Sequence, residues 1–489
     1  MQPGDGASTR KIGLESCGWN MATTCNEQLK RPIEHDGEPE SNRWRQLVAE
    51  LEPKGLRTYT PSLAVIARAE GSYVWTPEGR RLADFTSGVL VANLGHNPRN
   101  WWQRLWGYLE LDRTFGLGDY LTAVPLTSYN AVTPLEVEAA RRLVALLRSE
   151  PGGARMEQVL WAASGSEAVQ KALWAALKFR PGRNRILATR FGFHGKKGLA
   201  GAVTGSERDP ERDPRVRFIR FPLEECIDVT KRREPIDLSI YEEELERIAE
   251  QEKDRLACLI TEPYLGGGGS YHPQPEYLQL LERFCRRHDV VFILDEIQSN
   301  FGRTGPLFAF THYGIEPDIV CLGKGLGNGI AVSAAVGRRD ILECLDYGEG
   351  SDTFSGNPLA SAAVLATLDA FADPAILENA RQLAAVLETG LTRLKKTGLV
   401  AYVRGEGCVW GVECAAVAGR TAAEVAQACV LACYQGDPSG RAIHLLGPLA
   451  GKVLRVSPPL TMVPAEAADY LDAMYGLLSR LANDWGVSG

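Results

Sequence analysis

The stretch VVFILDEIQSNFGRTG (residues 290–305), followed by PDIVCLGKGLGNG (residues 317–329), decides the fold. Each stretch has a short apolar run that ends in polar or glycine-rich residues, near Asp295 in the first and Lys324 in the second. Similar apolar runs alternate with helical stretches at 158–163, 185–190 and 256–261. This alternation is typical of a mostly parallel sheet, in which ligands bind beyond the carboxyl ends of the strands. The sequence therefore predicts an α/β fold with a site near Asp295 and Lys324.

The composition is that of an ordinary globular protein. The chain has 489 residues, 45% of them hydrophobic and 24% charged, which excludes a disordered, collagen-like or coiled-coil protein. The net charge of −7 leaves no basic excess for a phosphate backbone, so no nucleic acid partner is expected. The sequence lacks a long apolar run and an apolar signal core, so we expect no membrane span and a cytoplasmic location. Eleven cysteines without CxxC pairs indicate reduced thiols and no metal site.

Composition and periodicity suggest four parts along the chain. The charged piece from Gly205 to Pro235 is expected to lie at the surface, and Glu70 to Asp84 reads as a hairpin. Helical spacing of apolar residues predicts helices over 135–149, from Pro374 onward and near 422–434. The predicted parts are a flexible leader, the N-terminal part of a small domain, a large domain and a C-terminal small α+β domain, at 1–42, 43–100, 101–370 and 371–489.

The segment SGSEAVQKALWAALK (residues 164–178) combines a turn of small residues with the start of a predicted helix. Free backbone N–H groups and the positive end of the helix dipole favour an anion at Ser164, Gly165 and Ser166. The alternative is an ordinary helix start, with Ser164 as N-cap and Glu167 in the first turn. From this segment alone, the alternative is the favoured interpretation.

Asp295 and Lys324 each allow a structural and a functional interpretation. Asp295 either caps a turn or holds a cation, and Lys324 is either a surface lysine or a buried one. A lysine in a dry environment has a lowered pKa and acts as a nucleophile and base. A lysine, a carboxylate and an anion site together are what pyridoxal 5′-phosphate requires, for a Schiff base, for its ring nitrogen and for its phosphate.

From about Tyr59 to near the C-terminus, the chain resembles the class III aminotransferases, which are fold type I enzymes dependent on pyridoxal phosphate. The resemblance rests on an ordered set of motifs: SGSEA, FGFHG, TEP followed by GG, LDEIQSNFGRTG, PDIVCLGKGLGNG, DTFSGNPLA and LRVSPPL. It implies a large cofactor-binding domain, with a mostly parallel sheet sandwiched by helices, and a smaller α+β domain. The family includes ornithine, 4-aminobutyrate, putrescine and ω-amino acid transaminases.

The resemblance also implies roles for residues around the cofactor. Lys324 would form the Schiff base and shuttle a proton, and Asp295 would pair with the pyridinium nitrogen. Gln298 would bind the phenolic oxygen, Phe193 would stack on the ring and His194 would help to orient the cofactor region.

Other implied roles concern the phosphate and the substrate. Backbone N–H groups of Gly165 and Ser166 would hold the phosphate, and Thr353 would reach the phosphate of the neighbouring subunit. The resemblance thus implies a homodimer with sites at the subunit interface, or a tetramer of such dimers. Arg455 would grip the substrate carboxylate, a task suited to the guanidinium fork.

Three features bear on the substrate. Lys196 stands where related FHGR strings carry an arginine, and it is either a substrate ligand or a solvated loop residue. Gly267 stands where the common EPxQGE string has a glutamate that pairs with the arginine corresponding to Arg455. Arg455 is then either constantly available to a carboxylate or able to swing away for an uncharged group. SGVLVANLGHNP (87–98) matches a strand that lines the family's substrate pocket, with Val89 and Leu90 as candidate pocket residues.

The resemblance implies an aminotransferase with a ping-pong cycle, in which an amine or amino acid donates the amino group and a keto acid accepts it. A racemase, epimerase, aminomutase or decarboxylase on the same fold would share Lys324, Asp295 and the anion site. A catalytically silent scaffold is disfavoured, because Lys324, Asp295, Gln298 and Thr353 are all present.

Overall fold

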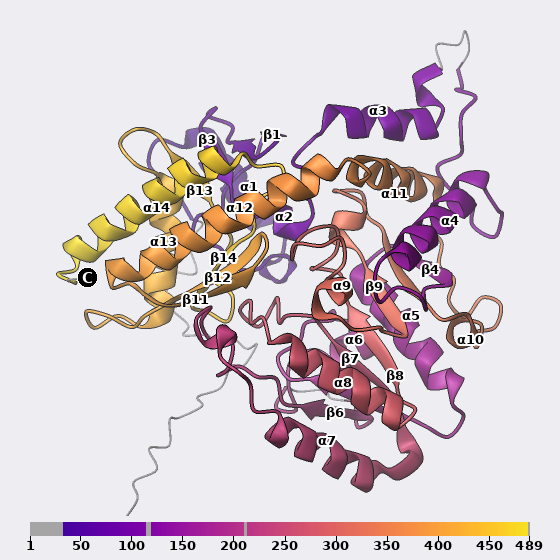
Figure 1. Ribbon diagram of the computed structural model, residues 1–489. Coiled ribbons are helices and arrows are strands. Elements are labelled where there is room, and N and C mark those ends of the chain that lie inside the picture. The colour runs from indigo at the N-terminus through magenta and orange to yellow at the C-terminus, as the bar shows by residue number, and fades with distance from the viewer. Residues whose placement is uncertain (1–32, 114–118, 210–212, 488–489) are drawn as a thin grey trace, which may run out of the picture.

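The computed structural model describes residues 33–113, 119–209 and 213–487. Figure 1 shows one large sheet with its helices and, beside it, two smaller sheets under the C-terminal helices. Most of the predicted leader lies outside the described residues, and the first described helix, α1 (Pro39–Leu51), crosses its predicted end at residue 42. The domain boundaries expected after residues 42, 100 and 370 stay predictions.

The large sheet has seven strands in the order β4-β10-β9-β8-β7-β5-β6. Its strands are β4 (Gln158–Ala162), β5 (Arg185–Thr189), β6 (Val216–Ile219), β7 (Leu256–Thr261), β8 (Val291–Asp295), β9 (Ile319–Leu322) and β10 (Ser333–Gly337). Only β10 runs antiparallel to its neighbours β4 and β9, and the other pairs are parallel. The predicted mostly parallel sheet is therefore confirmed.

Alternate residues of the central strands pack on opposite faces of this sheet. Val291 and Ile293 of β8 belong to a cluster with α5 (Gly165–Phe179), whereas Phe292 and Leu294 belong to one with α8 (Pro275–Arg287). Side chains of a strand alternate between its two faces, so the sheet is buried on both sides. Asp295 therefore lies on the face that α5 covers.

Further helices surround the large sheet or lead to it, as Figure 1 shows. Their bounds are α2 (Ser87–Leu90), α3 (Arg99–Tyr108), α4 (Pro134–Ser149), α6 (Gly198–Ala202), α7 (Ser239–Glu252), α9 (Ala309–Tyr313), α10 (Arg339–Leu342) and α11 (Pro358–Phe371). Short 3-10 turns lie at Lys54–Leu56, Leu111–Arg113, Lys231–Arg233, Lys253–Arg255, Lys324–Leu326 and Leu394–Thr397. The helix expected over 135–149 is confirmed as α4.

Two small sheets lie beside the large one: the first joins strands from the beginning of the chain to β13 near its end, and the second consists of C-terminal strands alone. One has the order β1-β2-β3-β13 and the other β11-β12-β14. Their bounds are β1 (Arg68–Glu70), β2 (Tyr73–Trp75), β3 (Arg81–Asp84), β11 (Val400–Glu406), β12 (Val409–Cys414), β13 (Ala442–His444) and β14 (Val453–Val456). Pairing of β2 with β3 confirms the predicted hairpin. The covering helices are α12 (Pro374–Arg393), α13 (Ala422–Gln435) and α14 (Pro464–Asp484), and the first two confirm the helices expected from Pro374 and near 422–434.

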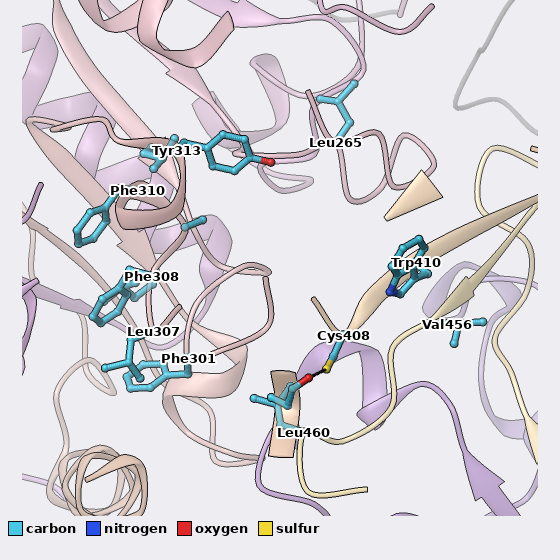
Figure 2. Packing of buried hydrophobic residues seen from close by; sticks show 14 of the residues in the cluster. Leu265, Phe301, Leu307, Phe308, Phe310, Tyr313, Cys408, Trp410, Val456 and Leu460 are labelled. Carbon is cyan, nitrogen blue, oxygen red and sulfur yellow. Dashed lines mark hydrogen bonds between the residues drawn. The ribbon is translucent and has the colours of Figure 1, made fainter. Parts of the chain in front are cut away.

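One hydrophobic cluster joins the large sheet to the C-terminal strands. Figure 2 shows Phe301, Phe308 and Phe310 grouped on the side of the large sheet, with Trp410 and Val456 on the strands across from them. The rings of Phe308 and Phe310 are stacked at 5.4 Å, and Phe301 meets Phe308 edge-on at 5.6 Å. This packing holds the segment after β8 in place, and that segment carries the predicted site residue Gln298.

Two sequence expectations are wrong. The charged piece 205–235 is not wholly superficial, because it contains β6, whose Phe218 and Ile219 are buried against the sheet. The segment 87–98 is not a strand. Ser87, Gly88, Val89 and Leu90 have φ angles of 43°, 60°, 69° and 61°, and this left-handed turn replaces the expected strand.

The described cysteines are free, and all of them except Cys344 are buried. Within the described ranges, no single helix has the length and apolar character needed to cross a membrane. The bent pair formed by α11 and the helical stretch from Pro374 to Thr397, with a 73° bend, passes the test of length and composition, although most of α11 is buried in the protein.

Candidate active site

Asp295 and Lys324 come together because β8 and β9 are adjacent parallel strands. Asp295 is paired with Cys321 in the sheet register, and the amide of Glu296 donates to the carbonyl of Cys321 at 2.9 Å. Lys324 follows Cys321 by three residues, so both side chains start from the same edge of the sheet. The juxtaposition that the sequence predicted is thus present in the backbone.

Lys324 occupies a strained and partly desolvated position. Its φ angle is 47°, a left-handed conformation that costs a non-glycine residue about 1–3 kcal/mol and is often kept at functional sites. The side chain keeps some solvent contact, but burial of the amine lowers its pKa to about 8, against the opposing effect of Asp295. Roughly a tenth of this lysine is therefore uncharged at pH 7, far more than for an ordinary lysine, and the uncharged form is the nucleophile and base.

The carboxylate of Asp295 is buried and held on both sides. Its Oδ2 lies 2.7 Å from Nδ1 of His194, and its Oδ1 accepts from the amide of Ile297 at 3.1 Å. Asp295 is 3% exposed. The remaining ring nitrogen of His194, Nε2, is buried without a described hydrogen-bond partner. His194 therefore orients Asp295 directly, a more specific contact than the sequence indicated.

The start of α5 has the N-cap arrangement that the simpler interpretation predicted. The Ser164 hydroxyl accepts from the Glu167 amide, and the Glu167 carboxylate accepts from the Ser164 amide, which is a capping box. The first-turn N–H groups at Gly165 and Ser166 still have no acceptor inside the helix. Gly195 packs so closely that a Cβ there would lie 2.3 Å from the hydroxyl of Ser166. Only glycine fits there without moving Ser166.

Gln298 and Glu262 lie next to the loop after β7. The Gln298 side-chain oxygen is buried without a described partner, and a Cβ at Gly266 would lie 2.2 Å from it. Glu262 accepts from the amides of Phe193 at 2.8 Å and Gly266 at 3.2 Å, so it fixes the backbone of the predicted stacking residue. Burial raises the pKa of Glu262 to about 7.

Arg455 lies on β14, opposite Gly411 of β12. It is 7% exposed, and its Nε has no hydrogen-bond partner within the described ranges. Burial and then the like charge of Arg303 lower its pKa from the ordinary value. The loop across from it has Gly267, which supplies no carboxylate. A buried guanidinium of this kind favours an anionic ligand.

Four further predicted residues differ in their exposure to solvent. Lys196 is exposed, which fits the solvated-loop interpretation. Val89 is 39% exposed, whereas Leu90 is buried in a cluster with Tyr264 and Val409. Thr353 is exposed in the turn before α11.

The turn that carries Thr353 is anchored to α5 by a buried lysine. The Lys171 amine donates to the carbonyl of Trp161 at 2.5 Å, to Asp352 Oδ2 at 2.8 Å and to Ser355 Oγ at 3.1 Å. Lys171 is 4% exposed. The helix whose first turn lies at the predicted anion site therefore also fixes the position of Thr353.

Sequence reasoning missed several residues that shape the site. Arg303 is fully buried and donates to Ser87 Oγ at 3.0 Å and to Asn93 Oδ1 at 2.6 Å, which holds the left-handed turn. Glu296 accepts from the amides of Ala309 and Phe310 at 2.8 Å. Glu262 follows the apolar strand β7 as Asp295 ends β8, so the strand-end signal used for Asp295 was available for Glu262 too.

The residues present fit pyridoxal phosphate. The group needs an amine, an acid for its ring nitrogen, a donor for its phenolic oxygen and N–H groups for its phosphate. Lys324, buried Asp295 and the first turn of α5 supply three of these, and the side-chain NH2 group of Gln298, whose oxygen is buried beside Gly266, can supply the fourth. No group of three or more His, Cys, Asp or Glu residues in the described part of the chain is arranged to hold a metal ion.

Comparison with known proteins agrees with this chemistry. Residues 55–478 match the family described as aminotransferase class-III. The acetylornithine aminotransferase of Xanthomonas campestris is 30% identical over 427 residues, covering 85% of this chain and 93% of that protein. The counterpart in Oceanobacillus iheyensis is 27% identical, covering 86% and 94%.

Solved structures give the same result. An amine transaminase from an uncultivated Pseudomonas species is 27% identical, with a TM-score of 0.73 and coverage of 88% of this chain and 97% of its own. The ornithine aminotransferase of Toxoplasma gondii shares the fold at 23% identity, with a TM-score of 0.76 and coverage of 92% and 97%. The chain therefore belongs to the class III aminotransferases, and it is a pyridoxal-phosphate-dependent enzyme of fold type I that transfers an amino group to a keto acid.

Proposed function

We propose that this aminotransferase acts on donors and acceptors that both carry a carboxylate next to the reacting carbon, that is, on α-amino acids and α-keto acids. The observation that carries the proposal is Arg455, a buried cation with no ion-pair partner within the described ranges. Because Gly267 supplies no competing carboxylate, Arg455 stays available in both halves of the reaction. A swing of this side chain into solvent is disfavoured by the packing around it.

The protein groups divide the chemical work between them. When bound, pyridoxal phosphate holds the amino group and withdraws electron density from the substrate carbon. Lys324 Nζ takes the proton from that carbon and returns one in the reverse half, because its lowered pKa leaves it partly uncharged. Asp295, fixed by His194 at 2.7 Å, holds negative charge beside the ring nitrogen. Arg455 holds the substrate carboxylate.

The remaining predicted cofactor contacts complete this assignment. N–H groups of Gly165 and Ser166 bind the phosphate, and Gln298 donates to the phenolic oxygen. Phe193 stacks on the ring, with its backbone held by Glu262 at 2.8 Å. Stacking of this kind contributes about 0.5–1.5 kcal/mol beyond burial.

A substrate panel tests the proposed function. L-Alanine and L-glutamate should be the better donors with pyruvate or 2-oxoglutarate, and N-acetylornithine, putrescine and 1-phenylethylamine should be worse by about 100-fold in kcat/KM, because none of them has a carboxylate next to the reacting carbon for Arg455 to bind. The relatives named for acetylornithine and for amines make the last three the relevant competitors. Equal efficiency for an amine and an α-amino acid would contradict the proposal.

The active unit of this proposal is a homodimer in which Thr353 serves the phosphate site of the other subunit. Support comes from the exposure of Thr353 and of apolar side chains in the chain before and within α4 and beside Thr353. These are Tyr120, Leu121, Leu126, Tyr129, Val132, Val137 and Phe354. Exposed apolar residues in this number are typical of a surface that another chain covers.

Mixing two inactive variants tests the shared site. A chain with Lys324→Ala keeps Thr353, and a chain with Thr353→Asp keeps Lys324 but places a negative charge beside the phosphate. Each alone should be nearly inactive. After denaturation and refolding together, heterodimers should regain activity at the one site that combines both intact residues. Recovery no greater than the sum of the separate variants would show that Thr353 acts within its own subunit.

A further inference from the structure

The hydroxyl of Tyr264, in the loop after β7, and the Nε of Arg455, across from that loop, are buried without hydrogen-bond partners among the described residues. Tyr264 is 1% exposed and His272 is fully buried. Each such group loses its bonds to water on folding, which costs about 1–3 kcal/mol unless a partner replaces the water. Two of them together indicate a ligand that supplies the missing bonds.

Packing places Tyr264 close to Arg455. The ring of Tyr264 lies in a buried cluster with Leu90 and Val409. Val409 begins β12, and that strand pairs with β14, where Arg455 lies opposite Gly411. Apart from burial itself, the charge of Arg455 has the largest effect on the pKa of Tyr264. Apart from burial, Tyr264 likewise has the largest effect on the pKa of Arg455.

The orientation of the Tyr264 ring is fixed from behind by His272. The two rings are stacked, with centroids 4.2 Å apart and planes 7° from parallel. Burial lowers the pKa of His272 to about 4, so the imidazole is uncharged near neutral pH and adds no positive charge beside Arg455. Burial also raises the pKa of Tyr264 above its ordinary value, so the phenol keeps its proton.

We propose that Tyr264 is a specificity-determining residue, and that it places an uncharged side chain beside the guanidinium of Arg455 in place of an acidic one. Its hydroxyl donates a hydrogen bond to a substrate carboxylate held by Arg455. A carboxylate in this loop would instead pair with the guanidinium and compete with the substrate. A phenol leaves the positive charge intact, so a carboxylate is favoured in both half-reactions. This inference rests on the proposed role of Arg455 and extends it to a second residue.

The substitution Tyr264→Phe removes the hydroxyl and keeps the ring that stacks on His272. In the holoenzyme, KM for pyruvate and for L-alanine should rise about tenfold, as expected for loss of one hydrogen bond to a charged group, with little change in kcat. Activity with 1-phenylethylamine as donor, at saturating pyruvate, should not change. Binding of propionate, which has a carboxylate but no amino or keto group, should weaken about tenfold by calorimetry.

Tyr277→Phe is the matched control. Tyr277 is also a fully buried tyrosine, but its hydroxyl donates to the backbone carbonyl of Arg220. It should leave the propionate affinity and the ratio of carboxylate to amine activity unchanged. An equal loss for all substrates in Tyr264→Phe, or unchanged propionate binding, would overturn the proposal.

A second variant tests whether the side chain beside Arg455 must be uncharged. This test does not depend on whether the Tyr264→Phe variant folds. Gly267→Glu puts a carboxylate into the same loop and should weaken propionate binding about tenfold or more. Unchanged binding in that variant would overturn the idea that an uncharged companion matters. The variant Arg455→Ala separates failure of the proposed function from failure of the proposed role of Tyr264. If Arg455→Ala leaves propionate binding intact, the proposed function fails, whereas loss in Arg455→Ala without loss in Tyr264→Phe refutes only the role of Tyr264.

Discussion

Replacing Lys324 by alanine should lower the rate of amino transfer by about 10²- to 10⁴-fold, the range that a positioned acid–base group contributes. The loss follows because no other described lysine follows β9 at the edge where Asp295 ends β8. The measurement is a single-turnover assay of the loaded enzyme with an amino acid donor, followed through the absorbance of the cofactor. Covalent loading should be lost as well, although phosphate binding at α5 should persist.

Lys178→Ala is the appropriate control for Lys324→Ala. Lys178 lies on α5 and is paired with Glu349 at the surface, so its loss should leave both loading and rate unchanged. A Lys324→Ala enzyme that keeps more than about a tenth of the wild-type rate would be incompatible with the proton-transfer role, since that role accounts for at least about 10² in rate.

Replacing Arg455 by alanine should lower kcat/KM for keto acids by about 10²- to 10³-fold, since leaving a buried charge unpaired costs about 3–5 kcal/mol. Here the unpaired charge is the substrate carboxylate, which would enter a site where both terminal nitrogens of Arg303 already donate to neutral acceptors. The rate with an amine donor, measured as single-turnover transfer to the cofactor, should change little.

Arg455→Lys refines this test. A lysine keeps the positive charge but cannot make the bidentate contact, so it should recover only part of the loss. If Arg455→Ala leaves the efficiency for keto acids unchanged, the carboxylate role assigned to Arg455 is wrong, whatever happens in the lysine variant.

The sequence was sufficient for the parallel part of the large sheet because its strands are continuous apolar runs with polar ends. It was insufficient for β6 and β10. The first lies within a stretch rich in Arg and Asp, and buried Phe218 and Ile219 give it only a short apolar signal. The second, SAAVG, is made of small residues that lack the usual branched or aromatic signature. The pairing of both strands is fixed by tertiary contacts.

The turn at 87–90 shows a second reason why the sequence was insufficient to predict the structure. Its sequence, SGVL, has ordinary strand propensity after Gly88, yet all four residues adopt positive φ angles. Nothing local favours this conformation for Val89 or Leu90. It is held from a distance by Arg303, which donates to Ser87 and Asn93 from a loop more than two hundred residues away.

The candidate site likewise contains residues that a local sequence pattern predicts and contacts that only the tertiary structure shows. Lys324, Asp295 and the start of α5 follow from strand ends and a helix start, which a sequence displays. The contact of His194 with Asp295 and the stacking of Tyr264 on His272 depend on how loops from different strands meet. No periodicity or motif spacing specifies such contacts.

The central claim is that one ring bridges the Lys324 amine and the Asp295 carboxylate, and the most direct measurement is attachment of pyridoxal phosphate to the cofactor-free protein. Attachment is followed by absorbance between pH 6 and 10, a range that extends about two units to either side of the lysine pKa. The attached cofactor is then trapped with borohydride for peptide mapping. The account predicts that the trapped cofactor is on the peptide carrying Lys324 and that the attachment rate rises with pH around a midpoint of about 8, where that amine loses its proton. Trapping on another lysine, such as Lys196, or no trapping at any pH, would contradict it.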